Sequence, residues 1–252
     1  MDESKQTAKK YDKHGKEYHD YRKSKTNFYN SMIDIPAVLG LLKDIKGKKI
    51  IDIGCGSGIY SEILQKKGAE VVGIDISKTL IEIAKSEVKK VEFRVANIKE
   101  LPFKNNSFDI AVSALMLGYL ENWDRAFSEV KRILKPGGVF IFSILNPIYE
   151  CKEETMVNGE KYKIIGISKD HTKVLGDYFK ERWIETTIIK KMKIKSHHKT
   201  YETIIDTILR NGFSIEGYKD AKPIAKGKKI SVIDYRTFSK LPIFCVFKIK
   251  KK

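Results

Sequence analysis

Apolar runs and amphipathic stretches alternate between residues 48 and 145. The apolar runs cover residues 48–54, 69–75, 91–96, 108–116 and 139–145, and each has the length and β-branched content of a buried strand. The stretches between them repeat their apolar residues every three or four positions, which predicts helices. Strands that alternate with helices form a parallel sheet with right-handed crossovers, so the pattern predicts a doubly wound α/β fold.

Helix boundary signals agree with this pattern. Ser77 is expected to cap a helix over 77–90, and Gly68 to end the helix before it. A helix over 123–138 is expected to end at Pro136 and the glycine pair that follows. Before the first strand, a helix is predicted over 4–22 and another over 28–45, interrupted or restarted at Pro36. Residues 1–45 are thus predicted to form an N-terminal helical lid.

The alternation changes after residue 147. Residues 148–198 contain stretches with a period of two, which favour antiparallel strands. A helix over 200–211 with Thr200 as its N-cap, a strand over 213–220 and a final strand within 241–252 follow. The prediction is a mostly parallel seven-stranded sheet whose last strand is antiparallel. Its core is 46–147, its C-terminal part is 199–252, and 148–198 is an inserted antiparallel β cap over the substrate, at the strands' carboxyl ends.

Charge and cysteine content add constraints. The net charge is +17, and residues 146–252 hold 24 basic and 13 acidic residues, against 13 and 12 in residues 51–145. A solvated lysine coat and a surface that attracts anions both explain this excess. Only 7 of the 49 basic residues are arginine, which weakens a nucleic-acid interpretation. Three scattered cysteines favour neither disulfides nor a metal site, and a cytoplasmic location is expected. No apolar run is long enough to span a membrane, and no secretory signal is recognised.

A glycine-rich turn follows the first strand. Gly54, Cys55 and Gly56 lie between this strand and the next helix, where bare backbone lets a ligand approach the free N–H groups of the helix. Alone, the turn is equally compatible with tight packing. Asp75, which ends the second strand, can accept hydrogen bonds from both ribose hydroxyls of an adenosine. Ile59 stands where the dinucleotide fingerprint has its third glycine, and no P-loop follows, so a ligand without a pyrophosphate is favoured.

Four stretches, residues 50–58, 71–77, 96–117 and 126–147, resemble the successive motifs of class I S-adenosylmethionine-dependent methyltransferases. The group that includes the quinone-biosynthesis methylases (methyltransferase type 11) is the most similar, and the resemblance covers residues 48–147. It implies a Rossmann-like core, S-adenosyl-L-methionine as cofactor and S-adenosyl-L-homocysteine as product. It further implies that Gly54 and Gly56 pass under the methionine and ribose, that Asp75 holds the ribose diol, and that Ile76 packs on the adenine. Cys55 belongs to the same loop, with its side chain as a small filler.

The resemblance also assigns the rest of the cofactor site. Asn97 is expected to contact the adenine amino group, with Ile98 beside it, although relatives usually have an acid at this position. Ala114, after the fourth strand, would line the sulfonium end. Tyr18 and Arg22 would close over the methionine tail, where the guanidinium can pair with the carboxylate. A surface helix with solvated side chains is the alternative for Tyr18 and Arg22.

Methyl transfer is an in-line displacement that needs a base only when the acceptor arrives protonated. His197 and His198 are the candidate bases, and His198 is predicted to be the catalytic one; a surface or capping role is the alternative. Tyr119 is a candidate for the border of the acceptor site. No metal site is predicted.

Three functions remain open from the sequence. The predicted function is methylation of a small molecule, for which an anionic acceptor would suit the charge. No Asn/Asp-Pro-Pro-Tyr/Phe motif follows the fourth strand and no cysteine stands beside a proline, which argues against base methylation. An RNA methyltransferase that uses the basic C-terminal third is the first alternative. A non-catalytic cofactor-binding module, suggested by Asn97, is the second. The methylated atom and the oligomeric state are not predicted.

Overall fold

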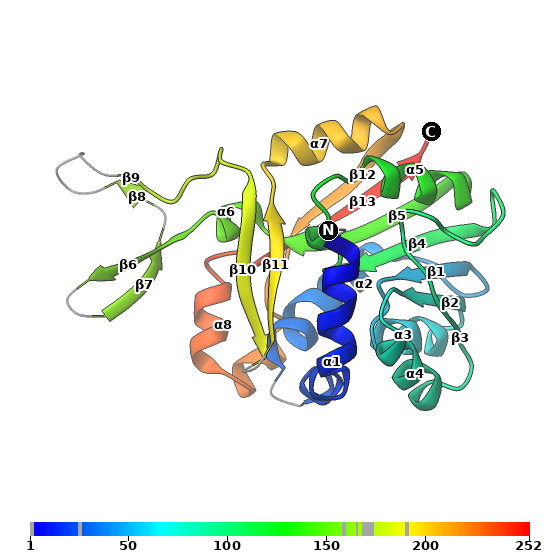
Figure 1. Cartoon of the computed structure of the whole chain (residues 1–252), viewed down its shortest axis with the longest axis horizontal. Coiled ribbons are helices and arrows are strands. Elements are labelled where there is room, and N and C mark those ends of the chain that lie inside the picture. Colours follow the sequence, from blue (N-terminus) through cyan, green and yellow to red (C-terminus); the bar gives the residue numbers. More distant parts are fainter. Residues whose placement is uncertain (1–2, 25–26, 158–159, 165, 168–173, 190–191) are drawn as a thin grey trace.

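A seven-stranded sheet forms the centre of the molecule, with strand order β12-β13-β5-β4-β1-β2-β3 (Figure 1). The computed structural model describes residues 3–24, 27–157, 160–164, 166–167, 174–189 and 192–252. The first five strands run parallel, and β13 runs antiparallel between β5 and β12. This arrangement confirms the predicted fold class. The strands are β1 (Lys49–Ile53), β2 (Glu70–Asp75), β3 (Glu92–Val95), β4 (Phe108–Ala114), β5 (Leu134–Leu145), β12 (Phe213–Asp220) and β13 (Phe244–Lys251).

Both faces of the sheet are covered, because successive strand residues point to opposite sides. Ile51 and Phe142 pack in one apolar cluster with residues of α5 (Asp124–Ile133) and α7 (Tyr201–Arg210). Ile50 and Ile141 belong to a second cluster with residues of α2 (Ile35–Leu41), α3 (Ile59–Lys66) and α8 (Val232–Phe238). Near-continuous apolar strands are therefore what this doubly covered sheet requires.

Several predicted caps are confirmed. Ser77 Oγ accepts a hydrogen bond from Leu80 N at the start of α4 (Lys78–Glu87), and Thr200 Oγ1 accepts one from Thr203 N at the start of α7. The predicted end of the helix after Trp123 is wrong. α5 ends at Ile133, and residues 134–138 already belong to β5. Pro136 lies three residues after the end of α5, within β5, and a proline disfavours helical backbone angles at the residue before it.

The N-terminal helices are close to those predicted. α1 spans Glu3–Lys23, and a π-helical stretch over Tyr29–Asp34 leads into α2. Pro36 stands in the first turn of α2, where its missing N–H costs no hydrogen bond, and α2 ends at Leu41 rather than at residue 45. In the part of the chain that the structure describes, no helix is long and apolar enough to cross a membrane.

The segment after β5 is built of antiparallel pairs, as predicted. A short helix, α6 (Pro147–Glu150), precedes β6 (Glu153–Val157), β7 (Glu160–Ile164), β8 (Gly166–Ile167) and β9 (Val174–Leu175), which project from the body in Figure 1. β10 (Arg182–Ile189) and β11 (Met192–His198) form a longer hairpin that contacts α1. Within the alternating stretches 161–168 and 182–194, residues 165, 168 and 190–191 lie outside the described residues. The 3-10 helix Ala225–Lys229 and α8 were not predicted, although Ser231 caps α8 by accepting from Asp234 N.

Candidate functional site

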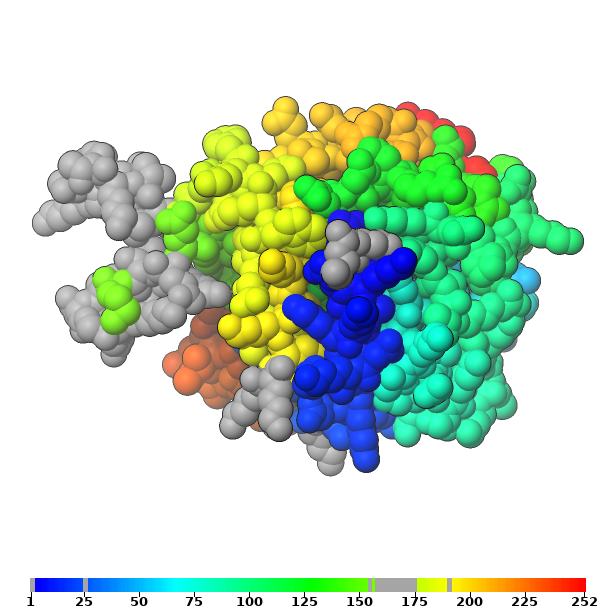
Figure 2. Space-filling model, viewed as in Figure 1, coloured from blue at the N-terminus to red at the C-terminus, as the bar shows by residue number. Residues whose placement is uncertain are grey.

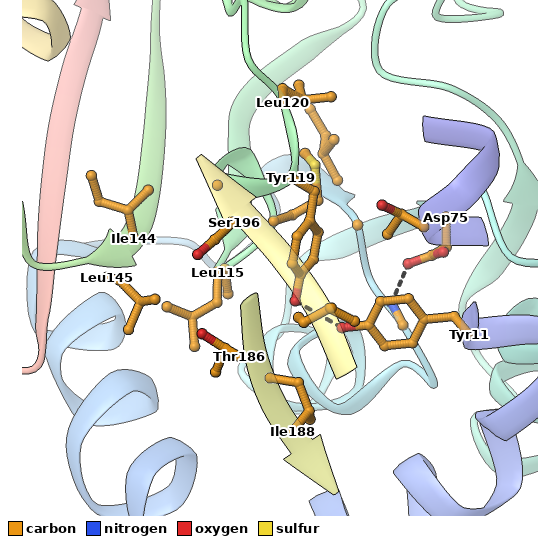
Figure 3. A pocket seen from close by; sticks show the side chains of 18 of the residues that line it. Tyr11, Asp75, Leu115, Tyr119, Leu120, Ile144, Leu145, Thr186, Ile188 and Ser196 are labelled. Carbon is orange, nitrogen blue, oxygen red and sulfur yellow. Dashed lines mark hydrogen bonds between the residues drawn. The ribbon is translucent and has the colours of Figure 1, made fainter. Parts of the chain in front are cut away.

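A cavity of about 450 Å³ lies at the carboxyl ends of the parallel strands, under α1 and the β10–β11 hairpin (Figure 3). Its wall includes the glycine loop, the ends of β2 and β4, and residues of β10 and β11 such as Thr186 and Ser196. All ten residues predicted to bind the cofactor line it: Tyr18, Arg22, Gly54, Cys55, Gly56, Asp75, Ile76, Asn97, Ile98 and Ala114. The topology thus brings five separated parts of the chain to one cavity.

The glycine loop is held against β2 by its own backbone. The N–H groups of Gly54 and Cys55 both donate to the carbonyl oxygen of Ile74, at 2.8 and 2.9 Å. Gly54 and Gly56 have φ of +73° and +55°, in the region that favours glycine. A Cβ on Gly54 would lie 2.5 Å from Met116 Cγ, whereas a Cβ on Gly56 would meet only Tyr18 Cε1, at 3.9 Å. Gly54 is therefore needed for packing, and Gly56 leaves open backbone on the cavity side.

Asp75 is fixed by two backbone donors. Its Oδ2 accepts from Gly56 N and its Oδ1 from Ser77 N, both at 2.9 Å. Burial raises the pKa of Asp75, and the bonds from Ser77 and Gly56 oppose that shift. Each carboxylate oxygen keeps a further lone pair for a ligand. The side chain is only partly buried, so these lone pairs can face the cavity.

Asp52, at the end of β1, is the acid that the sequence analysis left without a role. It is buried and lines the cavity, and its Oδ2 accepts from Ser61 Oγ at 2.6 Å. Burial raises the pKa of Asp52 to about 6, and the nearby Asp75 adds to this shift. The cavity floor therefore holds two carboxyl groups that both favour the protonated form more than a solvated aspartate does.

The loop after β3 and the end of β4 complete this half of the cavity. Asn97 Oδ1 accepts a hydrogen bond from Lys99 N at 3.0 Å, which stabilises a turn of the chain. The side-chain NH₂ takes no part in this hydrogen bond. Ile98 is buried beside it. Ala114 is the last residue of β4 and is partly buried.

Tyr18 and Arg22 come from α1, one helical turn apart. Arg22 Nη1 donates to the Tyr18 hydroxyl at 2.7 Å. Arg22 Nε is buried and has no hydrogen-bond partner among the described residues. A buried guanidinium with an unpaired N–H is costly unless a ligand pairs with it. This geometry fits a ligand carboxylate better than it fits a solvated surface helix.

The β10–β11 hairpin and α1 meet above the cavity. Tyr11 and Tyr119 share a hydrogen bond of 2.8 Å between their hydroxyls, and Lys10 Nζ donates to the backbone oxygen of Lys193 at 2.7 Å. Figure 2 shows α1 and the hairpin side by side on one face of the molecule. Tyr119 lines the cavity, and its place at the border of the acceptor site stays a prediction.

The two histidines of β11 lie on opposite sides of the strand. His197 lines the cavity, and its Nδ1 is 3.3 Å from Lys199 Nζ. Burial and the charge of Lys199 lower the pKa of His197. His198 is fully buried, is not part of the cavity wall, and has Nε2 2.9 Å from the carbonyl oxygen of Tyr178. The catalytic role of His198 stays a prediction, and direct contact with an acceptor is open to His197 instead.

Sequence reasoning missed Glu150 and Lys199, which also line the cavity. Lys199 is 7% exposed, donates to the backbone oxygen of Glu121, and has no carboxylate of the described residues within 4.0 Å. Burial lowers the pKa of Lys199. Lys199 directly follows His197 and His198 in the sequence, and this cluster of three basic side chains is the signal that could have identified Lys199. Glu150 follows Asn146-Pro147 by only a few residues, and nothing in its sequence context marks it.

Comparison with known proteins gives the family of the chain. Residues 51–142 match the family model described as a methyltransferase domain. The chain is 35% identical over 212 residues to an uncharacterized protein of Methanocaldococcus jannaschii, covering 79% of this chain and 76% of that protein. It is 32% identical over 120 residues to the ubiquinone biosynthesis O-methyltransferase of Coxiella burnetii, covering 46% and 51%. The crystal structure of an S-adenosylmethionine-dependent methyltransferase from Mesorhizobium loti superposes with a TM-score of 0.71 at 26% identity, covering 86% of this chain and 96% of that one.

Proposed function

Since this chain belongs to the class I S-adenosylmethionine-dependent methyltransferases, with a methyltransferase domain of type 11, we propose that it methylates a small-molecule acceptor. The roof formed by α1 and the β10–β11 hairpin, which the bond from Lys10 Nζ to the backbone oxygen of Lys193 joins, is the observation that carries this proposal. A cavity of about 450 Å³ has the size of a small-molecule site. A roofed cavity admits a compact acceptor more easily than a strand of RNA.

The chain's own residues suit S-adenosyl-L-methionine. The open backbone at Gly56 and the unpaired N–H of Arg22 are the two features that such a ligand would use. In this proposal Asp75 binds the ribose diol, Ile76, Asn97 and Ile98 surround the adenine, and Gly54, Cys55 and Ala114 lie along the methionine end. Tyr18 and Arg22 bind its carboxylate. When bound, S-adenosyl-L-methionine supplies a methyl group on a positively charged sulfur, and S-adenosyl-L-homocysteine is the product.

The acceptor half of the cavity is largely apolar with one buried cation. Leu115, Leu120, Ile144, Leu145 and Ile188 line it, as Figure 3 shows. Lys199 brings a buried ammonium group that is hydrogen-bonded to the backbone oxygen of Glu121 and lies 3.3 Å from His197 Nδ1, with no carboxylate of the described residues within 4.0 Å. A buried charge without an opposite charge in contact is costly, so an acceptor with an anionic group would stabilise it. We therefore propose an apolar acceptor of low molecular mass that carries a negative charge.

In-line transfer needs the acceptor atom, the methyl carbon and the sulfur in a row, with water excluded. Tyr11 and Tyr119, joined by their hydroxyls, would keep the roof closed over that line. A cytoplasmic location is part of the same proposal, because Cys55, Cys151 and Cys245 are buried thiols rather than disulfides.

Turnover assays test the proposal. The full chain is incubated with labelled S-adenosyl-L-methionine and, in parallel, with a metabolite library and with total RNA. We expect S-adenosyl-L-homocysteine to form with a small molecule and not with RNA. Label transfer to RNA alone, with binding that weakens steeply as salt rises, would instead support the RNA alternative.

A further inference from the structure

Glu150 lines the cavity where α6 meets β11, and His198 lies behind it and faces its carboxylate. The side chain of Glu150 is 9% exposed and lines the cavity, and its Oε1 accepts from Ser196 Oγ at 2.5 Å. Its Oε2 lies 3.7 Å from His198 Nδ1. Figure 3 draws Ser196 with Leu115 and Ile144, the apolar side chains of this part of the wall. A carboxylate is therefore held at the cavity wall between Ser196 and His198.

The backbone decides which nitrogen of His198 carries hydrogen. Nε2 is 2.9 Å from the carbonyl oxygen of Tyr178, and a carbonyl only accepts, so Nε2 donates. In the neutral ring the lone pair is then on Nδ1. This Nδ1 is buried and has no hydrogen-bond partner among the described residues, and it faces Glu150.

At 3.7 Å, Oε2 of Glu150 and Nδ1 of His198 are beyond hydrogen-bond distance. A proton between carboxylate and imidazole would draw the two atoms to about 2.7–2.9 Å, the length of a charge-assisted hydrogen bond. With a neutral ring and an ionised carboxylate, two lone pairs face each other in this buried place. The pair is thus arranged to take up one proton and to hold it between Oε2 and Nδ1. No lysine or arginine of the described residues lies within 4.0 Å of the Glu150 carboxylate to compete for it.

We propose that Glu150 is the catalytic base that takes the proton of a phenolic hydroxyl bound in the cavity, and that His198 is a positioning residue that shares this proton. The proposal rests on the methyltransferase function proposed above and adds the acceptor's chemical class. A base is useful only if the reacting atom carries a proton, which excludes a carboxylate acceptor. A carboxylate is a weak base, and it matches an acidic phenol better than an aliphatic alcohol.

The step balances without a further reactant. The O–H bond of the phenol breaks, and its electron pair forms the new bond to the methyl carbon. The electron pair of the broken carbon–sulfur bond stays on sulfur, which becomes neutral. The proton passes to Oε2 of Glu150 and is stabilised by Nδ1 of His198 until it leaves to solvent.

Two acceptors of similar shape test the role of Glu150. Phenol keeps its proton in mildly alkaline buffer, whereas 4-nitrophenol is ionised there and needs no base. We expect Glu150→Gln to lower kcat for phenol about 100-fold or more while kcat for 4-nitrophenol and the affinity for S-adenosyl-L-homocysteine stay unchanged. His198→Gln keeps a donor for Tyr178 and should lower kcat for phenol less. It should cause no further loss in the Glu150→Gln background, because both residues act on one proton.

Glu121→Gln is the matched control. Glu121 also lies near a histidine, 3.8 Å from His197 Nε2, but its side chain is 61% exposed and is not part of the cavity wall. The proposal is overturned if Glu150→Gln lowers kcat equally for both acceptors or lowers it for neither. It is also overturned if the wild type methylates no phenol. Methylation of amines or carboxylic acids without phenols would overturn this inference and leave the proposed function intact.

Urea unfolding gives a readout that needs neither cofactor nor acceptor. Glu150→Gln replaces one of two facing lone pairs with an N–H that can donate to Nδ1. We expect the urea midpoint to rise or to stay the same. A lower midpoint would mean that the wild-type pair already holds a proton, and the proposal would then be wrong.

Discussion

The carboxylate of Asp75 is hydrogen-bonded to the backbone of Gly56, with 2.9 Å between Oδ2 and the glycine nitrogen. This bond joins the glycine loop after β1 to the end of β2. The second oxygen accepts from Ser77 N, so the carboxylate is oriented before any ligand arrives. The two parts of the chain that suggested an adenosine site therefore form one preorganised surface.

Asp75→Asn should weaken binding of S-adenosyl-L-homocysteine about 10–100-fold, which corresponds to about 1.4–2.7 kcal/mol for lost charge-assisted hydrogen bonds. The amide NH₂ must also face one of two backbone donors, Gly56 or Ser77, which displaces the side chain. Isothermal titration calorimetry measures the change. Asp206→Asn, on the exposed side of α7, is the control. Equal affinity in both variants would contradict the role of Asp75 in cofactor binding.

Arg22→Met should weaken the binding of S-adenosyl-L-homocysteine about tenfold or more, since it removes the donor proposed for the ligand carboxylate. The affinity for 5′-methylthioadenosine, which lacks the amino-acid tail, should change little. Comparing the two ligands by calorimetry separates loss of this contact from damage to the whole site. Arg94→Met, at an exposed position of β3, serves as the matched arginine substitution. A parallel loss for both ligands would argue that Arg22 only supports α1.

Asp52→Asn should change how stability depends on pH. The pKa of Asp52 is raised from 3.8 to about 6 in the folded protein, chiefly by burial. The folded state therefore binds the proton more tightly, and the free energy of unfolding falls as pH rises from about 4 to 6, by at most about 3 kcal/mol. An asparagine does not titrate and can still accept from Ser61. Urea unfolding at pH 4 and pH 7.5 should show the variant gaining on the wild type at the higher pH.

The comparison between the two pH values removes any constant effect of the amide. All other groups titrate in both proteins. A stability difference that is the same at pH 4 and pH 7.5 would show that Asp52 ionises with an ordinary pKa.

Phe127→Ala should lower the free energy of unfolding by about 3–5 kcal/mol, as expected for an aromatic side chain removed from a core. Phe127 is fully buried and packs against Phe140, Phe142 and Phe213 between α5 and the sheet. Phe127→Leu should cost less because it leaves a smaller cavity. Phe179→Ala, at a side chain 82% exposed, should change stability by less than about 0.5 kcal/mol. Similar losses at residues 127 and 179 would contradict this placement of the core.

Local signals explain why much of the fold was predicted. Strand and helix periods are properties of short stretches, and Ser77 and Thr200 cap their helices through contacts three residues away. The end of α5 was misjudged because apolar residues near Pro136 suit either a helix or a strand. The segment 221–240 was left without a prediction, since its short helix has only a weak period.

The sequence by itself determined the alternating fold, the glycine loop and the acid at the end of β2, because each depends on neighbours in the chain. Only the tertiary structure decided which side chains share the acceptor end of the cavity. Glu150 and Ser196 are 46 residues apart and meet only when β11 packs beside α6. The alternation of β11 placed His197 on the cavity and His198 behind it, against Glu150, and strand orientation of this kind depends on packing that no short stretch of sequence contains.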